Sequence, residues 1–244
     1  MALLEFGLLG GFQFSDPSGT TAALGTSRPE KLLAYLLLKS GSPQPRRRLA
    51  YLFWPDSDES QAQTNLRREL HRLRRLLPQT EQLMLAEDHR LGVRPGAVEC
   101  DVQLFERQLD LASSESSVKE RLERLHQAVA TYKGELLPEY YDDWVLEERE
   151  RLQERFLGAL ERIVQLLEAA GELAEAIEHA RRWQHLDPLS ERAVATLVKL
   201  HSHNGDRALA LSLLERYGSR LERDTGLGPG PELRALRKQL TGSR

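Results

Sequence analysis

The sequence is poor in the features that mark membrane and secreted proteins. Its 244 residues include one cysteine, Cys100, so an internal disulfide is excluded and the reducing cytoplasm is favoured. The longest apolar runs, such as Leu32–Leu38, fall far short of the roughly 20 residues that span a bilayer. Met1–Phe14 lacks the basic start of a secretory signal. We therefore expect a cytoplasmic protein without a membrane partner.

Sequence motifs of catalysis are also missing. The chain contains neither a Gly-x-x-x-x-Gly-Lys-Ser/Thr loop for nucleotide phosphates nor a Gly-x-Ser-x-Gly nucleophile elbow. His201 and His203 lie two residues apart, which points them in different directions on a helix and disfavours a shared metal ion. We expect no enzyme activity, no catalytic residue, no cofactor and no metal.

The charge is unevenly distributed along the chain. The hydrophobic residues make up 40% and the charged residues 29%, with a net charge of −3, which is ordinary for a globular protein. Residues 1–95 carry a net charge of +3, whereas residues 96–244 carry −6. Five arginines fall within Arg67–Arg75, and Arg46–Arg48 is an arginine triplet. This asymmetry indicates a phosphate-bearing partner for the first part, and a solvated helix face is the alternative.

The first part, residues 1–98, has the order of elements of a winged helix-turn-helix domain with an extra N-terminal sheet. Short strand signals at Leu3–Leu9, Phe12–Phe14 and Thr20–Leu24 predict a small antiparallel sheet with a turn at Asp16–Gly19. Apolar periodicity and capping residues then predict helices over Arg28–Lys39, Arg46–Phe53 and about Ser60–Leu77, the last closed by Pro78. Gln82–Ala86 and Leu91–Val93 predict a β-hairpin, the wing.

The second part, residues 99–244, shows only helical periodicity. The predicted helices cover about Val102–Leu111, Val118–Lys133, Asp142–Ala170, Glu172–Leu186, Leu189–Asn204, Asp206–Asp224 and Pro231–Leu240. Gly171 and Gly205 lie 34 residues apart, and Ala176 and Ala210 each follow their glycine by five. This period is typical of the tetratricopeptide repeat, although two glycine turns in a generic bundle could coincide. The chain as a whole is predicted to be mainly α with a small antiparallel β part.

The helix at Ser60–Leu77 has one apolar and one basic face. Its core stripe is expected to consist of Ala62, Leu66, Leu70, Leu73 and Leu77. A ridge of arginines held by such a stripe suits the major groove, where arginine pairs with guanine and neighbouring arginines hold phosphates. Salt bridges to the acidic second part are the alternative. With the wing tip added, the candidate DNA-binding residues are Thr64, Arg67, Arg68, His71, Arg72, Arg74, Arg75 and Arg90.

Several segments together resemble the Streptomyces antibiotic regulatory protein (SARP) family. Leu49–Pro55 and Asn65–Leu76 look like its response-regulator-type winged helix. Tyr132–Pro138, Leu186–Leu189 and Gly205–Ala208 resemble the bacterial transcriptional activator domain of the same family.

The resemblance implies a transcriptional activator that binds direct repeats in double-stranded DNA near promoters through its third helix. It implies recruitment of RNA polymerase, and a helical domain that aids formation of a homodimer, at least on DNA. The positions that match the recognition helix are Arg67, Arg68, His71, Arg72 and Arg75.

A different class of function remains open at this point. The net negative charge, and the acidic Glu87 and Asp88 at the wing tip, also fit a protein-interaction adaptor. In that case the helical repeats would bind a partner in their groove, and the winged domain would not bind DNA.

Overall fold

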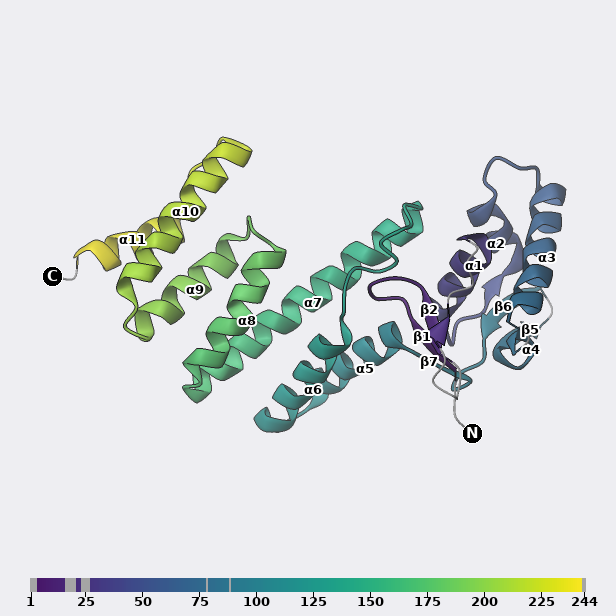
Figure 1. Cartoon of the computed structure of the whole chain (residues 1–244), viewed down its shortest axis with the longest axis horizontal. Helices are drawn as coiled ribbons and strands as arrows, with labels where there is room; N and C mark the ends of the chain where they lie inside the picture. The colour runs from purple at the N-terminus through teal and green to yellow at the C-terminus, as the bar shows by residue number, and fades with distance from the viewer. Residues whose placement is uncertain (1–3, 16–20, 23–26, 78, 88, 243–244) are drawn as a thin grey trace. The chain divides into compact units, whose positions relative to one another are not determined.

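The computed structural model describes residues 4–15, 21–22, 27–77, 79–87 and 89–242. The expected turn at Asp16–Gly19, the helix-closing Pro78 and the wing-tip residue Asp88 lie outside these ranges. The described chain is mainly helical with two small sheets (Figure 1), which confirms the predicted fold class. Within the described residues, no helix combines the length and apolar character that a membrane crossing requires.

The chain folds into two compact units that interleave along the sequence. The N-terminal unit consists of Met1–Arg107 and Ala130–Leu152, and the helical unit of Gln108–Val129 and Gln153–Arg244. This division follows packing rather than sequence, so the sequence domains at residues 1–98 and 99–244 stay a prediction.

Residues 27–93 of the N-terminal unit form the winged helix-turn-helix. Its elements are α1 (Ser27–Leu38), β4 (Gln44–Pro45), α2 (Arg46–Phe53), α3 (Glu59–Leu76), α4 (Thr80–Leu83), β5 (Met84–Glu87) and β6 (Arg90–Val93). The three strands pair in the order β4-β6-β5, and the predicted wing is the β5–β6 hairpin, in which Glu87 lies opposite Arg90. The single turn α4 was not predicted, because four residues are too few to show helical periodicity.

The second sheet has the strand order β3-β2-β1-β7, formed by Thr21–Ala22, Gln13–Ser15, Leu4–Gly7 and Val98–Cys100. The pairs β1–β2 and β2–β3 are antiparallel, as predicted. Strand β7 adds a parallel partner for β1, with Leu4 opposite Val98. A parallel pair needs a long crossover, and here the intervening chain contains β2, β3 and the whole winged helix-turn-helix.

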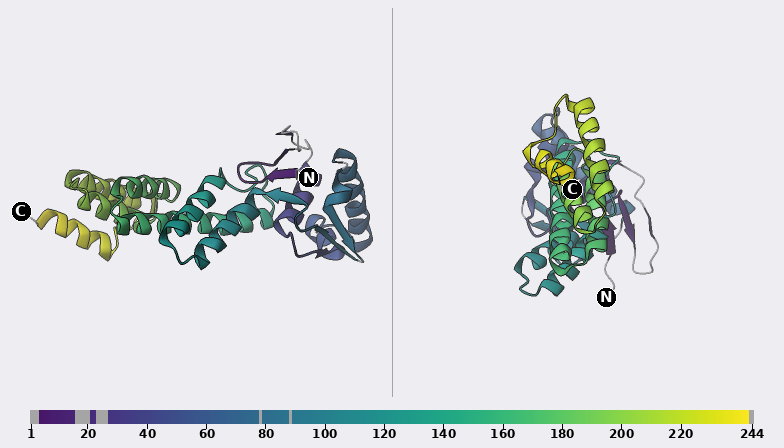
Figure 2. Two further views of the ribbon diagram at one scale, coloured as in Figure 1. Left: turned by 90° about the horizontal axis from the view of Figure 1, so that it is seen from below. Right: turned by 90° about the vertical axis from the view of Figure 1, so that its left-hand side faces the viewer.

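In the described part of the chain, seven further helices follow, each within a few residues of its predicted position. They are α5 (Asp101–Ser114), α6 (Val118–Thr131), α7 (Asp143–Ala170), α8 (Leu173–Leu186), α9 (Glu191–His203), α10 (Arg207–Thr225) and α11 (Pro231–Gly242). In the helical unit α8 packs on α9 and α9 on α10 (Figures 1 and 2).

The tetratricopeptide-like repeat is visible at both glycine turns. Gly171 and Gly205 adopt left-handed backbone conformations with φ of 81° and 85°, which glycine reaches without a steric penalty. Ala176 and Ala210 are both completely buried. A small side chain at these positions lets neighbouring helices approach closely, as the repeat requires.

The segment that leads into α7, together with the first turns of α7, belongs to the N-terminal unit. The guanidinium of Arg149 donates hydrogen bonds to the carbonyls of Leu136 (3.0 Å), Leu137 (2.8 Å) and Tyr140 (2.9 Å). The amide of Leu137 in turn donates to the carbonyl of Leu8. These contacts explain why residues 130–152 belong to the N-terminal unit.

Candidate nucleic-acid interface

Helix α3 is anchored by the apolar stripe that the sequence predicts. Ala62, Leu66, Leu70, Leu73 and Leu77 are all buried, and α3 packs on α1 and α2. The helix begins with a side-chain cap, since the Asp58 carboxylate accepts a hydrogen bond of 2.9 Å from the Gln61 amide. Buried leucines on one side and a capped start fix which side chains α3 presents to solvent.

The opposite side of α3 presents the predicted basic residues, hereafter the basic face. Its exposed members are Arg67, Arg68, His71, Arg72, Arg74 and Arg75. Thr64 is half-buried and less free, because its hydroxyl donates to the carbonyl of Ser60 and accepts from the Arg67 guanidinium. Seven of the eight candidate residues therefore lie on one helix.

The arginines of the basic face have no acidic partner in the described part of the chain. Among the ion pairs of that part, none uses an arginine of α3. Glu69, the one acidic residue within Arg67–Arg75, is buried on the core side. The pKa of Arg46 at the start of α2 is lowered, first by partial burial and then by the charges of Arg74 and Arg67. The start of α2 and the second half of α3 thus share one positive field.

Helix α2, which packs on α3, presents the exposed side chains of Arg47 and Tyr51. The Arg47 guanidinium lies 3.1 Å from the Glu59 carboxylate at the first residue of α3, which ties the two helices together at the turn. Tyr51 is 73% exposed, which is unusual for an aromatic side chain. Sequence reasoning missed Tyr51, although its place on the polar side of a short amphipathic helix could have revealed it.

Arg90 lies on the wing rather than on α3. Its side chain is exposed, and its guanidinium donates a hydrogen bond of 3.4 Å to the carbonyl of Pro43. The structure thus directs Arg90 toward the connector that precedes α2.

The histidines of α9 behave as the sequence predicts. The His201 ring is buried, with Nδ1 3.4 Å from the Asp206 carboxylate, whereas Nδ1 of the exposed His203 lies 3.3 Å from Glu168. The two rings therefore have separate partners. His126, Glu175 and His179 form a different cluster of possible metal ligands, which was not predicted from the sequence. The four-residue spacing of Glu175 and His179 was the sequence signal that could have indicated it.

Known proteins resemble this chain in its second part by sequence and along almost its whole length by fold. The family model of the bacterial transcriptional activator domain matches residues 100–241. None of the curated protein sequences matches significantly. Among solved structures, Mycobacterium tuberculosis EmbR in complex with a low-affinity phosphopeptide is similar, with a TM-score of 0.79 and 22% identity. The match covers 99% of this chain and 65% of that one, so the chain spans slightly less than two thirds of EmbR's length.

A tetratricopeptide-containing domain is also similar in part. The C-terminal domain of a Plasmodium falciparum FK506-binding protein matches 58% of this chain and 86% of its own, with 13% identity and a TM-score of 0.39. The whole-chain likeness to EmbR concerns the fold. Together with the matched family model, it confirms the resemblance to SARP-type regulators.

Proposed function

We propose that this chain, which belongs to the bacterial transcriptional activator domain family, is a cytoplasmic transcriptional activator that binds specific DNA sequences through α3. The observation that carries the proposal is the basic face, on which five exposed arginines and His71 follow one helix and have no carboxylate partner among the residues that the structure describes. An α-helix of this kind fits the major groove of B-DNA. Like charges on one helix face repel each other, and phosphates would relieve that repulsion.

The proposal gives the residues of the basic face two roles. Arg68, Arg72 and Arg75 follow one another at steps of four and three residues, so they form one line along the helix. Arginines on such a line pair with the O6 and N7 atoms of guanine. Arg67 and Arg74 lie to the side of this line and, with Thr64 and His71, would hold phosphates and orient the helix.

Two neighbouring elements would extend the phosphate contacts. The exposed Tyr51 on α2 carries a hydroxyl of the kind that bonds to phosphate oxygens. Arg90 on the wing would contribute a weaker contact, since its guanidinium also bonds to the Pro43 carbonyl and the acidic Glu87 lies opposite it.

The helical unit would act on partners rather than on DNA. Stacked helix pairs build extended surfaces for binding proteins. We propose that this unit joins two copies of the chain on a direct repeat near a promoter and contacts RNA polymerase.

Selection from a random duplex library tests the proposal. The full chain is incubated with the library at about 150 mM salt, where non-specific binding is weak, and the retained duplexes are sequenced. We expect an enriched direct repeat with half-sites about one helical turn, roughly 10 base pairs, apart. Arg216→Ala, an exposed arginine of α10, is the control and should select the same repeat. If the wild-type chain enriches no sequence, the proposal fails and the adaptor function is favoured.

A further inference from the structure

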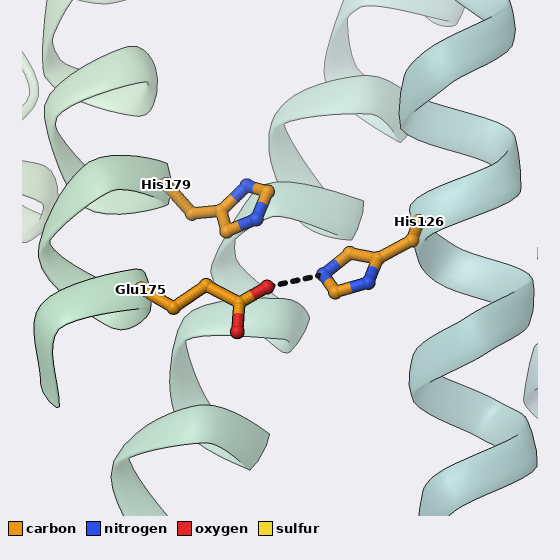
Figure 3. Close-up of side chains that lie close together, drawn as sticks. All are labelled: His126, Glu175 and His179. Carbon is orange, nitrogen blue, oxygen red and sulfur yellow. Dashed lines mark ion pairs between the residues drawn. The ribbon is translucent and has the colours of Figure 1, made fainter. Parts of the chain in front are cut away.

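Three side chains with metal-binding atoms converge between α6 and α8 of the helical unit (Figure 3). They are His126 from α6 and Glu175 and His179 from α8. One ligand atom from each lies within 4.8 Å of the other two. Nε2 of His126 is 3.6 Å from a carboxylate oxygen of Glu175, and the rings of His126 and His179 are stacked, with centroids 5.1 Å apart and planes at 16°.

Side chains from two helices meet at this point, and buried alanines lie beside them in the sequence. Glu175 and His179 are four residues apart, so they share one face of α8. Ala176 and Ala180, which follow each of them in sequence, are completely buried, as is Ala128 on α6. His126 and His179 are half-buried, and Glu175 is exposed.

We propose that His126, Glu175 and His179 form a binding site for a divalent transition-metal ion of the zinc type. Imidazole nitrogen and carboxylate oxygen are ligands that such ions prefer. In a tetrahedral zinc site with bonds near 2.0–2.1 Å, ligand atoms are about 3.3 Å apart. The 3.6 Å pair already approaches this separation, and small rotations of the side chains would bring in the third ligand.

The hydrogen bonding of His126 supports the site. Nε2 of His126 is shielded from solvent and has no hydrogen-bond partner in the described structure; its contact with Glu175 is too long for a hydrogen bond.

A bound ion would be coordinated by residues of both α6 and α8, and so would stabilise the helical unit. Three protein ligands leave one tetrahedral position for water, as the exposure of Glu175 allows. The site draws on no residue of the basic face, so this proposal and the proposed DNA binding stand or fall separately.

Zinc titration of the full chain tests the site. The tag-free protein is stripped with EDTA and titrated with Zn²⁺ in competition with a chromogenic chelator. We expect one equivalent bound, and an affinity at least 100-fold lower for His126→Ala and for His179→Ala, because even the loss of an outer partner of a ligand costs about 10–100-fold. His185→Ala, which removes an exposed histidine of the same helix, should bind like the wild type.

A further ligand variant keeps the test valid if the histidine variants misfold. Glu175→Gln alters an exposed side chain and should retain the circular dichroism spectrum while binding Zn²⁺ at least tenfold more weakly. Zn²⁺ should raise the melting temperature of the wild type and of His185→Ala by several degrees, and that of Glu175→Gln by less. Absence of binding to the wild type, or wild-type affinity in all three ligand variants, would mean that the residues form only an ion pair and would overturn the proposal.

Discussion

The backbone amide of Arg46 donates a hydrogen bond of 2.7 Å to the carbonyl of His89, so the first residue of α2 is fastened to the tip of the wing. The neighbouring residues Pro45 and Arg90 pair between β4 and β6. Helix α2 in turn packs against α3. The wing and the basic face are thus parts of one framework, and a surface ordered before binding loses less entropy when it meets its partner.

The start of α3 depends on one side chain. Asp58→Ala removes the carboxylate that caps the Gln61 amide and should lower the free energy of unfolding of the N-terminal unit by about 1 kcal/mol. Asp56→Ala, which removes a nearby exposed carboxylate, is the control and should change stability by less than about 0.5 kcal/mol. Urea unfolding followed by circular dichroism measures both. Equal effects of the two substitutions would exclude a specific cap.

The last turns of α3 offer a matched pair of leucines. Leu73 is completely buried, whereas Leu76 is 40% exposed. Leu73→Ala should therefore destabilise the N-terminal unit by about 2–5 kcal/mol through the cavity it leaves, and Leu76→Ala by clearly less. Thermal unfolding of both variants tests the orientation of the helix. A larger loss for Leu76→Ala would mean that α3 is rotated about its axis.

The salt dependence of DNA binding reports the phosphate contacts. If Arg67 and Arg74 each neutralise a phosphate, replacing either by alanine should make the slope of log affinity against log salt shallower by about 1. The weakening should be the same for specific and unrelated duplexes. Titrations by fluorescence anisotropy between about 50 and 300 mM salt measure the slope, with Arg216→Ala as the control. Unchanged slopes would show that these arginines do not touch the backbone.

Cys100 provides a reporter of the N-terminal sheet. Burial, and secondly the charge of Asp101, raise the pKa of its thiol to about 12. Because the pKa is raised, the reactive thiolate is scarce below it and, at pH 8, amounts to only about 1 in 10,000 molecules. We expect Cys100 to resist a thiol reagent at pH 8 in the folded chain and to react rapidly in denaturant. Rapid reaction of the folded chain would contradict the pairing of β7 with β1.

The helices could be predicted because their signals are local. Apolar residues at helical spacing and a capping residue such as Asp58 lie within the element that they define. The basic face follows from the same periodicity, since placing the leucines inside places the arginines outside. The glycine turns at Gly171 and Gly205 are local as well.

Other features of the fold and the histidine cluster depend on contacts between distant segments, and no sequence periodicity indicates such contacts. The pairing of Leu4 with Val98 joins strands that are separated by the whole winged helix-turn-helix. The hydrogen bonds from the Leu137 amide to the Leu8 carbonyl and from the Gly10 amide to the Glu135 carbonyl tie residues 130–152 to the N-terminal unit, although their sequence is typical of the helical domain. The rings of His126 and His179 come from helices that are far apart in the sequence and meet only in the folded chain.

The most direct test of the account compares specific with unrelated DNA. The affinity of the full chain for its selected direct repeat is divided by its affinity for a scrambled duplex at about 150 mM salt, for the wild type and for the double variant Arg68→Ala/Arg72→Ala. If these arginines read bases, each costs about 1–3 kcal/mol, and the ratio should fall at least tenfold while the circular dichroism spectrum is unchanged. An unchanged ratio in a folded double variant would contradict sequence reading by α3.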